Sequence, residues 1–353
     1  MKIAIVAITR NGAILGQKLA KGLASTQLFV SSRYAGQAGT DRQTFDPSGL
    51  SQLVASLWSE YNGLVFIMAS GIVVRMIAPL LESKDKDPAV VVMDDAGKFA
   101  ISLVSGHLGG ANELAERCAF ACGARAVITT ATDANGLPSF DMLAKELDWV
   151  IDDISRIKTL NSLLLDGEEI AVVDSSGQTR CWFHGRGKLS FYDSFDEAIK
   201  SRASGFLFVT NRHLPPHIQP EKLLILRPRN LVLGIGCNRG TPLEEIESLV
   251  TSHLKRLFLS IKSVACIATA VAKQDEPGLV AFAEQLGVPL VCYESEQLNH
   301  MTVPSPPSQH AFNAIGAVGV AEPAALLASK GGSLLLKKVK SENATLAVAE
   351  KEV

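Results

Sequence analysis

The sequence predicts an α/β protein with mostly parallel α/β domains at its N- and C-terminal ends and a small α+β region between them. Apolar runs of strand length alternate with segments of helical period almost from the first residue. Hydrophobic residues make up 47% of the 353 residues and aromatic residues only 6%, a balance that favours α/β packing over a β-sandwich. The alternation weakens after residue 150 and resumes at Leu231, so three regions are expected.

The N-terminal domain is expected to cover residues 1–149. Its strands are predicted at apolar runs, namely residues 3–8, 27–30, 63–68, 89–93, 98–104 and 126–130. Its helices are predicted where apolar residues recur every three or four positions, at residues 13–24, 50–61, 72–81, 108–122 and 137–147. The turn at residues 94–97, Asp-Asp-Ala-Gly, joins two of the strands as a hairpin.

The middle region is expected at residues 150–229, where the patterns are shorter and a proline-rich linker precedes Leu231. The C-terminal domain then covers residues 230–353. Its strands are predicted at residues 231–237, 263–269, 288–293, 333–339 and 344–350. Its helices are predicted at residues 242–260, 278–286 and 321–329.

Composition excludes several classes of partner. The net charge is −2 and no long basic run is present, which argues against nucleic acid and anionic membranes. The first apolar run has the length of a strand rather than of a signal peptide, and no stretch of about 18 apolar residues is available to span a bilayer. A soluble cytoplasmic protein is therefore expected.

The cysteine pattern favours reduced thiols. None of the six cysteines forms a CxxC pair, so neither a zinc site nor a thioredoxin-like motif is indicated. Cys118 and Cys122 lie one helical turn apart on an apolar face, where buried thiols are expected.

The stretch Ser105-Gly106-His107-Leu108-Gly109-Gly110-Ala111-Asn112 joins a predicted strand to a predicted helix. Each glycine in a first helical turn lowers helix stability by about 1 kcal/mol relative to alanine. The absence of side chains at these two positions must therefore serve another purpose. A helix N-terminus offers free N–H groups to anions, and we expect a ligand to approach closely here. His107 is a candidate functional residue; the alternative is a histidine that only caps or packs.

A second glycine-rich junction runs from Gly234 to Thr241. Thr241 as N-cap, Pro242 and Glu244 predict a capping box. The loop reads GxGxxxG and the next strand ends in Thr269 instead of an acidic residue, so the nicotinamide interpretation is weak. A loop that grips carboxylates, with Arg239 pointing into the site, is the better interpretation.

A third junction places Ser70 and Gly71 after a buried strand, with Arg75 one turn on. Ligands bind beyond the carboxyl ends of strands in open α/β sheets, so Ser70, Arg75 and His107 are expected at one site. No GxSxG elbow, HExxH motif or close His/Asp/Glu cluster is present in the sequence, which argues against a serine hydrolase and a protein-held metal. Glu276 and Glu322 stand at helix starts, where acids usually act as caps and dipole partners.

Residues 70–119, which contain "SGIVVRMIAP" and "SGHLGGANELAERCA", resemble the N-terminal signature of the cobalt-precorrin-5A hydrolase (CbiG) family. "VLGIGCNRGTPLEEI", "KQDEPGLVAFAEQLGVPL" and "VGVAEPAALLAS" resemble the C-terminal domain of that family. The loop at residues 303–308 and the segment around Glu322 depart from the family pattern, which puts the local geometry at Glu322 in doubt. The middle region fits the family by position only.

The resemblance implies a hydrolase of anaerobic cobalamin biosynthesis. Such an enzyme opens the ring A δ-lactone of cobalt-precorrin-5A and releases acetaldehyde to give cobalt-precorrin-5B. It needs no cofactor, because cobalt arrives inside the corrinoid substrate, and neighbouring enzymes of the pathway are candidate partners. His107 is then the candidate general base, with Ser70 and the N–H groups around Gly109 and Gly110 as oxyanion donors. The implied substrate-binding residues are Gly71, Arg75, Ser105, Gly106, Gly109, Gly110, Asn112, Gly234, Gly236, Asn238, Arg239, Gly240, Thr241 and Glu322.

Two other functions remain open at this point. A non-catalytic corrinoid carrier would bind the macrocycle without needing His107. An NAD(P)-linked α/β oxidoreductase would bind its cofactor near residues 234–240 and be protected against heat by it.

Overall fold

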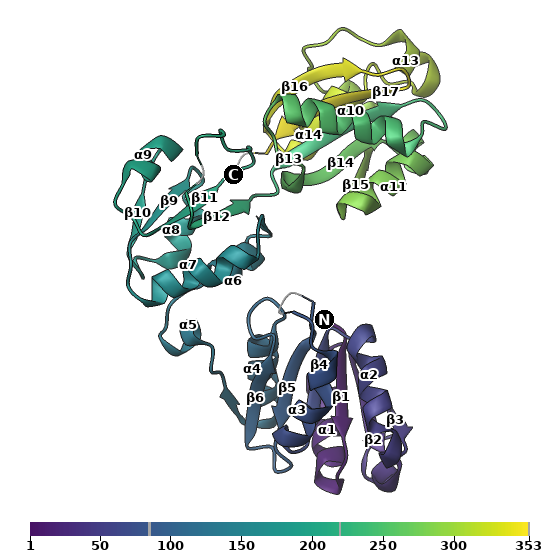
Figure 1. Cartoon of the computed structure of the whole chain (residues 1–353). Helices are drawn as coiled ribbons and strands as arrows, with labels where there is room; N and C mark the ends of the chain where they lie inside the picture. Colours follow the sequence, from purple (N-terminus) through teal and green to yellow (C-terminus); the bar gives the residue numbers. More distant parts are fainter. Residues whose placement is uncertain (84–85, 219, 352–353) are drawn as a thin grey trace. The chain divides into compact units, whose positions relative to one another are not determined.

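Figure 1 shows the chain as a computed structural model, which describes residues 1–83, 86–218 and 220–351. The chain divides into two compact units, Met1–Met142 and Leu143–Val353. The described residues contain three sheets, one in the first unit and two in the second. Each sheet falls within one of the three predicted regions; the domain boundaries that we expect after residues 149 and 229 stay a prediction. Residues 84, 85 and 219, which belong to the stretches discussed above, lie outside the described residues, as do residues 352 and 353.

The sheet of the first unit has seven strands in the order β3-β2-β1-β4-β5-β6-β7. Their bounds are β1 (Ile3–Ala7), β2 (Thr26–Ser31), β3 (Gln43–Phe45), β4 (Gly63–Ile67), β5 (Ala89–Met93), β6 (Phe99–Val104) and β7 (Arg125–Val127). All neighbours pair in parallel except β5 and β6, which form the predicted hairpin. The direction of the sheet therefore reverses at β6.

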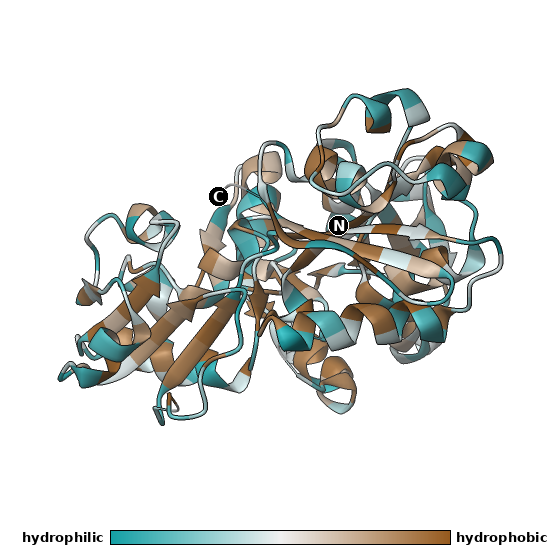
Figure 2. Cartoon of the chain, turned by 90° about the horizontal axis from the view of Figure 1, so that it is seen from above, coloured by the Kyte–Doolittle hydropathy of each residue, from teal (hydrophilic) through white to brown (hydrophobic). Residues whose placement is uncertain are grey.

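Helices cover both faces of this sheet. Their bounds are α1 (Arg10–Gly22), α2 (Leu50–Glu60), α3 (Ser70–Ile77) and α4 (Ala111–Cys122). Two further helices, α5 (Ala131–Ala134) and α6 (Phe140–Glu146), follow β7 along the chain, and the boundary between the two units falls within α6. Successive strand residues point to opposite faces. On one face Ile5 and Val65 pack in a core with α1 and α4, and on the other Val6 packs with α2 and α3. Both faces are apolar, because all the residues of β1, β4 and β5 are buried. Figure 2 shows brown, the colour of hydrophobic residues, on many strands of the chain.

The middle region contains the sheet β10-β9-β11-β12-β8. Its strands are β8 (Val150–Ile151), β9 (Ile170–Asp174), β10 (Leu189–Phe191), β11 (Gly205–Val209) and β12 (Leu223–Arg227), with helices α7 (Ser155–Leu165), α8 (Gln178–Phe183) and α9 (Phe195–Lys200). We expected an α+β region. Only β8 pairs antiparallel, however, so this region repeats the α/β pattern on a smaller scale. Two of its helices, α8 and α9, have only six residues each, which explains why the helical period is weak in this part of the sequence.

The C-terminal sheet has the order β15-β14-β13-β17-β16. Its strands are β13 (Leu231–Cys237), β14 (Val264–Ala270), β15 (Leu290–Tyr293), β16 (Ser333–Lys340) and β17 (Ala344–Glu350). Its helices are α10 (Leu243–Arg256), α11 (Pro277–Leu286), α12 (Ser295–Asn299), α13 (Gln309–Ile315) and α14 (Ala321–Ser329). β13, β14 and β15 pair in parallel as expected, whereas β17 and β16 add two antiparallel pairings.

The described residues bear on two further expectations. None of their helices combines the length and apolar character that a membrane crossing requires. The six cysteines are free thiols. Cys118 is fully buried in the core of the first unit, and burial raises the pKa of its thiol to about 12, so it behaves as an apolar side chain.

Candidate active site

Residues 105–110 form the loop that leads from β6 to α4 and carries His107. Gly110 is the N-cap of α4 and has a φ of 89°, in the left-handed region that favours glycine. A Cβ atom on Gly109 would lie 2.3 Å from the Cβ atom of Ser105 and 2.8 Å from its carbonyl oxygen. The conformation of the loop itself therefore requires both glycines. We expected them to allow a ligand to approach the backbone closely, but no ligand is needed to explain them.

The first N–H groups of α4 are bonded within the same loop. Three of them donate to loop carbonyl groups at 3.0 Å: Gly110 to His107, Ala111 to Ser105 and Asn112 to Gly106. The prediction that the helix start offers these groups to an anion is therefore wrong for this structure, and Gly110 is not an oxyanion donor in it. His107 also precedes α4 instead of lying in its first turn.

The imidazole ring of His107 lies between two carboxylates. Its Nδ1 atom is 2.9 Å from Oδ2 of Asp141, in the first turn of α6, and its Nε2 atom is 2.7 Å from Oδ2 of Asp133, in α5. The hydroxyl group of Thr132 is 3.2 Å from Nε2. The His107 side chain is 16% exposed, that of Asp141 is 7% exposed and that of Asp133 is 45% exposed. One carboxylate is thus buried behind the ring and the other faces solvent.

Asn112 and Thr130 hold the solvent-facing carboxylate in place. The side-chain amide of Asn112 donates to Oδ2 of Asp133 and to the Thr130 hydroxyl group, each at 3.0 Å, and the Thr130 hydroxyl group donates to the same carboxylate oxygen. The Ser102 hydroxyl group in turn donates to Oδ1 of Asn112 at 2.7 Å. Asn112, which we predicted to bind substrate, therefore belongs to the hydrogen-bond network around His107.

The two carboxylates change the acidity of the histidine. The hydrogen bond to Asp141 is the main cause of a raised pKa for His107; burial opposes it, and the charges of Asp141 and Asp133 and the hydrogen bond to Asp133 reinforce it. The protonated ring is thereby favoured. A titratable group with a perturbed pKa, flanked by acids and partly open to solvent, is typical of acid–base chemistry.

The sequence prediction included His107 but missed both carboxylates. Asp133 and Asp141 are 26 and 34 residues from His107 along the chain, so the cluster exists only in the folded state. β7 runs parallel to β6 and is its neighbour, which brings the segments after the two strands to the same edge of the sheet. Asp133 comes three residues after the strand predicted at residues 126–130, so its place after that strand could have indicated it. Nothing in the sequence pattern singles out Asp141.

Ser70, Gly71 and Arg75 do not lie with His107, which corrects the prediction of a common site. Ser70 begins α3, which follows β4, and β4 is parallel to β5. Because β5 and β6 are antiparallel, the segment after β4 and the segment after β6 lie at opposite edges of the sheet. β6 has six residues, so the two edges are roughly 20 Å apart. Arg75 instead donates to the carbonyl oxygen of Gly71 at 2.8 Å. Ser70 is therefore not an oxyanion donor for chemistry at His107.

The glycines of β13 serve helix packing. A Cβ atom on Gly234 would lie 1.9 Å from the carbonyl oxygen of Ala321, the first residue of α14, and one on Gly236 would lie 2.8 Å from Oγ1 of Thr345. These two residues thus let α14 and β17 pack closely, and neither is open to a ligand on that side. Gly240 has a φ of 74° and open space around its Cα atom.

The predicted capping box at the start of α10 is absent. The helix begins at Leu243 with Pro242 as the N-cap and no side-chain capping bond. The hydroxyl group of Thr241 is buried and donates to the carbonyl oxygen of Asn238 at 2.9 Å. Thr241 therefore stabilises the loop that precedes the helix, because its side chain turns back toward that loop.

Asn238 and Arg239 lie at the open side of the same loop. The Asn238 side chain contacts Oδ1 of Asn343 at 3.1 Å and Nε2 of His310 at 3.2 Å. Arg239 has an 82% exposed side chain, and its nearest carboxylate oxygen is 3.8 Å away on Glu276. Its guanidinium group is thus available to an anion.

Glu276 and Glu322 are buried and bonded. Glu276 accepts hydrogen bonds from the Gly240 N–H group and from the Lys273 ammonium group, each at 3.0 Å. It is the N-cap of α11 by position, but its side chain holds the α10 loop. Glu322, predicted to bind substrate, accepts from the Ser305 hydroxyl group at 2.8 Å and from the Lys338 N–H group at 2.9 Å.

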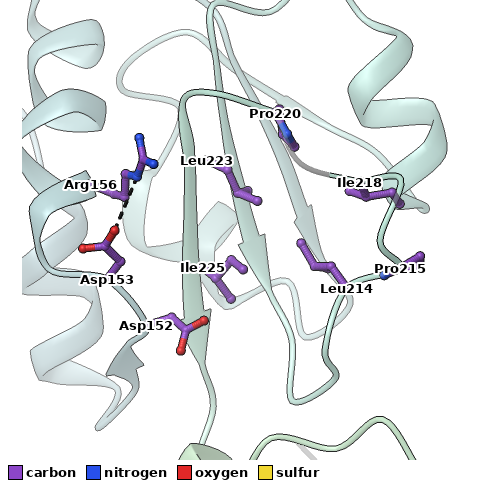
Figure 3. Close-up of a pocket in the computed structure, with 9 residues that line it drawn as sticks. All are labelled: Asp152, Asp153, Arg156, Leu214, Pro215, Ile218, Pro220, Leu223 and Ile225. Atoms are coloured by element: carbon purple, nitrogen blue, oxygen red, sulfur yellow. Dashed lines mark ion pairs between the residues drawn. The ribbon is translucent and has the colours of Figure 1, made fainter.

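A separate cavity of about 280 Å³ lies in the middle region (Figure 3). Leu223 and Ile225 of β12 line it on one side and the loop with Ile218 on another, and Asp153 forms an ion pair with Arg156 at 3.4 Å on its rim. None of the predicted site residues lines this cavity. Arg156 is the one cationic side chain among its described lining residues, and it is paired with Asp153, so the cavity offers little to a ligand that carries carboxylates.

Comparisons with known proteins agree with this architecture. Three family models match consecutive parts of the chain: cobalamin synthesis G N-terminal at residues 52–133, the cobalamin biosynthesis central region at residues 138–228 and cobalamin synthesis G C-terminus at residues 231–349. The chain is 38% identical to cobalt-precorrin-5A hydrolase of Priestia megaterium, over 98% of this chain and 94% of that protein. It belongs to the cobalt-precorrin-5A hydrolase family. A second member of this family, from Salmonella typhimurium, is 32% identical over 98% of this chain and 96% of its own length.

A shorter relative matches only part of the chain. Protein CobE from Sinorhizobium is 35% identical over 121 residues, which are 34% of this chain and 79% of CobE. Among solved structures, a cobalamin biosynthesis protein G homologue from Sulfolobus solfataricus is 23% identical, with a TM-score of 0.37 over 99% of this chain and 97% of that one.

Proposed function

We propose that this chain hydrolyses cobalt-precorrin-5A, opening the ring A δ-lactone and releasing acetaldehyde to give cobalt-precorrin-5B. Membership of the cobalt-precorrin-5A hydrolase family over nearly the whole length supports this proposal. One observation assigns the reaction to particular residues: the two ring nitrogen atoms of His107 contact Asp141 and Asp133. This cluster is the acid–base centre of the proposed reaction.

The proposed chemistry needs only proton transfers and water. Water adds to the lactone carbonyl carbon, the ring C–O bond breaks and the departing oxygen takes up a proton. The hydroxyl group formed then loses its proton as a C–C bond breaks, acetaldehyde leaves and the electron pair that remains on the macrocycle takes up a proton. Each stage requires one group that accepts a proton and one that donates a proton, and the His107 cluster supplies both kinds of group.

Substrate carboxylates require cationic and N–H partners. We propose Arg239, with its exposed guanidinium group, as a partner of the acetate and propionate groups of the macrocycle, and Asn238 beside it as a hydrogen-bonding partner. Both residues stand at the loop after β13, at the carboxyl end of a strand that pairs in parallel with β14, which is a common place for ligands in α/β sheets.

The same proposal extends to the cofactor requirement, the location and the partners of the enzyme. Cobalt enters as part of the substrate, and the enzyme uses no cofactor of its own. It works in the cytoplasm, with the corrinoid and neighbouring enzymes of the pathway as partners and without nucleic acid or membrane.

Anaerobic incubation with cobalt-precorrin-5A tests the function directly. Acetaldehyde is trapped as it forms and the corrinoid is followed by mass. Wild-type protein is expected to release one acetaldehyde per ring-opened product, and His107→Asn to release it at least 100-fold more slowly, while Glu113→Gln, an exposed change on α4, matches wild type. Binding of the corrinoid without acetaldehyde would show a carrier, and heat protection by a nicotinamide cofactor would show an oxidoreductase.

A further inference from the structure

The two carboxylates that contact His107 differ in their surroundings. Asp141 is buried, whereas Asp133 is 45% exposed and the ring between the two carboxylates keeps 16% of its side chain exposed. We infer that His107 acts as a protonated general acid when the lactone opens, that Asp133 accepts the proton of the attacking water, and that Asp141 positions the ring. This inference rests on the proposed function and reverses the role of base that the sequence suggested for His107.

Hydrogen-bond chemistry decides the resting state of the ring. An ionised carboxylate only accepts hydrogen bonds, and a neutral imidazole carries an N–H group at one nitrogen and a lone pair at the other. With carboxylate oxygens 2.9 Å from Nδ1 and 2.7 Å from Nε2, both nitrogens must donate, which requires the imidazolium form. The charged groups that act on the ring are Asp141 of α6 and Asp133 of α5; α4 adds the neutral amide of Asn112 to this network. An imidazolium ring can donate a proton, and it has no free nitrogen lone pair with which to accept one.

Asp133 is the group placed to take the proton from water. Its Oδ2 atom is oriented by the Asn112 amide, the Thr130 hydroxyl group and the His107 ring, and its side chain is open to solvent. A substrate that approaches from solvent has access to this carboxylate and to the exposed part of the ring. Asp141 is only 7% exposed and contacts Nδ1, so it acts through His107.

The protons balance in this arrangement. Asp133 takes a proton from water as the water oxygen bonds to the lactone carbonyl carbon, and the Nε2–H group of His107 protonates the departing ring oxygen as the C–O bond breaks. Asp133 is then neutral and His107 is neutral. Asp133 then gives its proton to solvent water and His107 takes one up from solvent water, which restores the starting state. The net change is the addition of one water molecule.

The test combines pH–rate profiles with a direct measurement of the ring. In wild-type protein, kcat is expected to fall as pH rises through the titration of His107, because the acid is lost. In Asp141→Asn this fall moves to lower pH, and kcat drops about 10- to 100-fold while KM stays within about threefold; Asp141→Glu restores most of the rate. Asp133→Asn loses at least 100-fold in kcat and still binds the corrinoid. Nitrogen NMR of ¹⁵N-histidine protein at pH 7, with His107→Gln to assign the signals, is expected to show both ring nitrogens of His107 protonated.

Several results would overturn this division of roles. Activity that rises with pH through the His107 titration would make the ring the base, and an Asp133→Asn enzyme within threefold of wild type would remove Asp133 from the reaction. A neutral His107 ring at pH 7 would contradict the resting state without any assay. If wild-type protein releases no acetaldehyde, the proposed function fails first, and the NMR result still decides the state of the ring. Circular dichroism of each variant shows that it has folded.

Discussion

The Oδ2 atom of Asp141 lies 2.9 Å from Nδ1 of His107, and the two residues come from segments separated by a helix, a strand and a second short helix. The carboxylate is buried and the ring is mostly buried, so the pair links α6 to the loop before α4 in the first unit. Any change in the charge of the ring is therefore also a change in the stability of that unit.

The stability of the first unit should depend on pH through His107. Its pKa is raised in the folded protein, mainly by the hydrogen bond to Asp141, so the folded state binds the proton more tightly than the unfolded state does. The stabilisation is complete below the unfolded value of about 6.5 and is lost as pH rises through the raised pKa. Thermal unfolding of the full chain between pH 6 and pH 9 checks this. His107→Gln should remove this component of the pH dependence, and an identical pH dependence in the two proteins would contradict it.

Ser70 and His107 should act independently. They stand at opposite edges of the first sheet, roughly 20 Å apart, because β5 and β6 are antiparallel. The effects of Ser70→Ala and His107→Asn on kcat/KM should therefore add within about 0.5 kcal/mol in the double variant. Kinetics of the wild type, the two single variants and the double variant measure this coupling. A coupling above about 1 kcal/mol would mean that the two residues share one site.

Replacing Gly109 should destabilise the loop that carries His107. The added Cβ atom would lie 2.3 Å from the Cβ atom of Ser105, which already has a φ of 60° and has little freedom to move. We expect Gly109→Ala to lower the free energy of unfolding by about 1–3 kcal/mol and to reduce kcat as His107 shifts. Gly49→Ala is the matched control, because its Cβ atom meets nothing within 4 Å and its φ of −92° suits alanine. Equal melting temperatures for the two variants would show that the Ser105 contact imposes no constraint.

Glu276 should stabilise the α10 loop in a pH-dependent way. Burial opposes its ionisation, but the Gly240 N–H group and the Lys273 ammonium group outweigh burial and lower its pKa. The ionised form therefore stabilises the folded state above the unfolded value of about 4.3, and this contribution is lost as pH falls through the lowered pKa.

Glu276→Gln is expected to cost about 1–3 kcal/mol at pH 7, with a smaller difference from wild type at pH 3. Urea unfolding at the two pH values measures the cost. Glu284→Gln, an exposed change on the same helix, is the control and should be neutral. A difference that does not shrink at low pH would point to packing instead of charge.

Most of the strands and helices were predictable because their signals are local. Continuous apolar runs such as residues 63–68 and the glycine-containing turn at residues 94–97 determine their own structure, and both match the observed elements. The pairing in the middle region was not predictable in the same way. Whether β9 pairs in parallel with β11 depends on contacts between residues far apart in the chain, which no local pattern specifies.

The candidate site was predictable only in part, for the same physical reason. A glycine-rich loop with one histidine stands out in the sequence, and His107 is indeed central to the cluster. Asp141 is an ordinary acid in the first turn of a helix until folding places it beside the ring. The position of Ser70 was wrong because the predicted hairpin at residues 94–97 reverses the chain before His107, and the prediction of one common site did not take this reversal into account.

The place of β17 in the C-terminal sheet has a consequence for biosynthesis of the protein. Residues 344–350 lie between β13 and β16, so β13 has no neighbour on that side until they have been translated. During synthesis, all the strands of the first unit and of the middle sheet are translated before β17. The parallel strands β13, β14 and β15 are also translated before β17, but β13 then lacks a neighbour on one side. An open strand edge is a template for pairing with other chains. The nascent polypeptide therefore presents an exposed strand edge from the time β13 emerges until β17 joins the sheet.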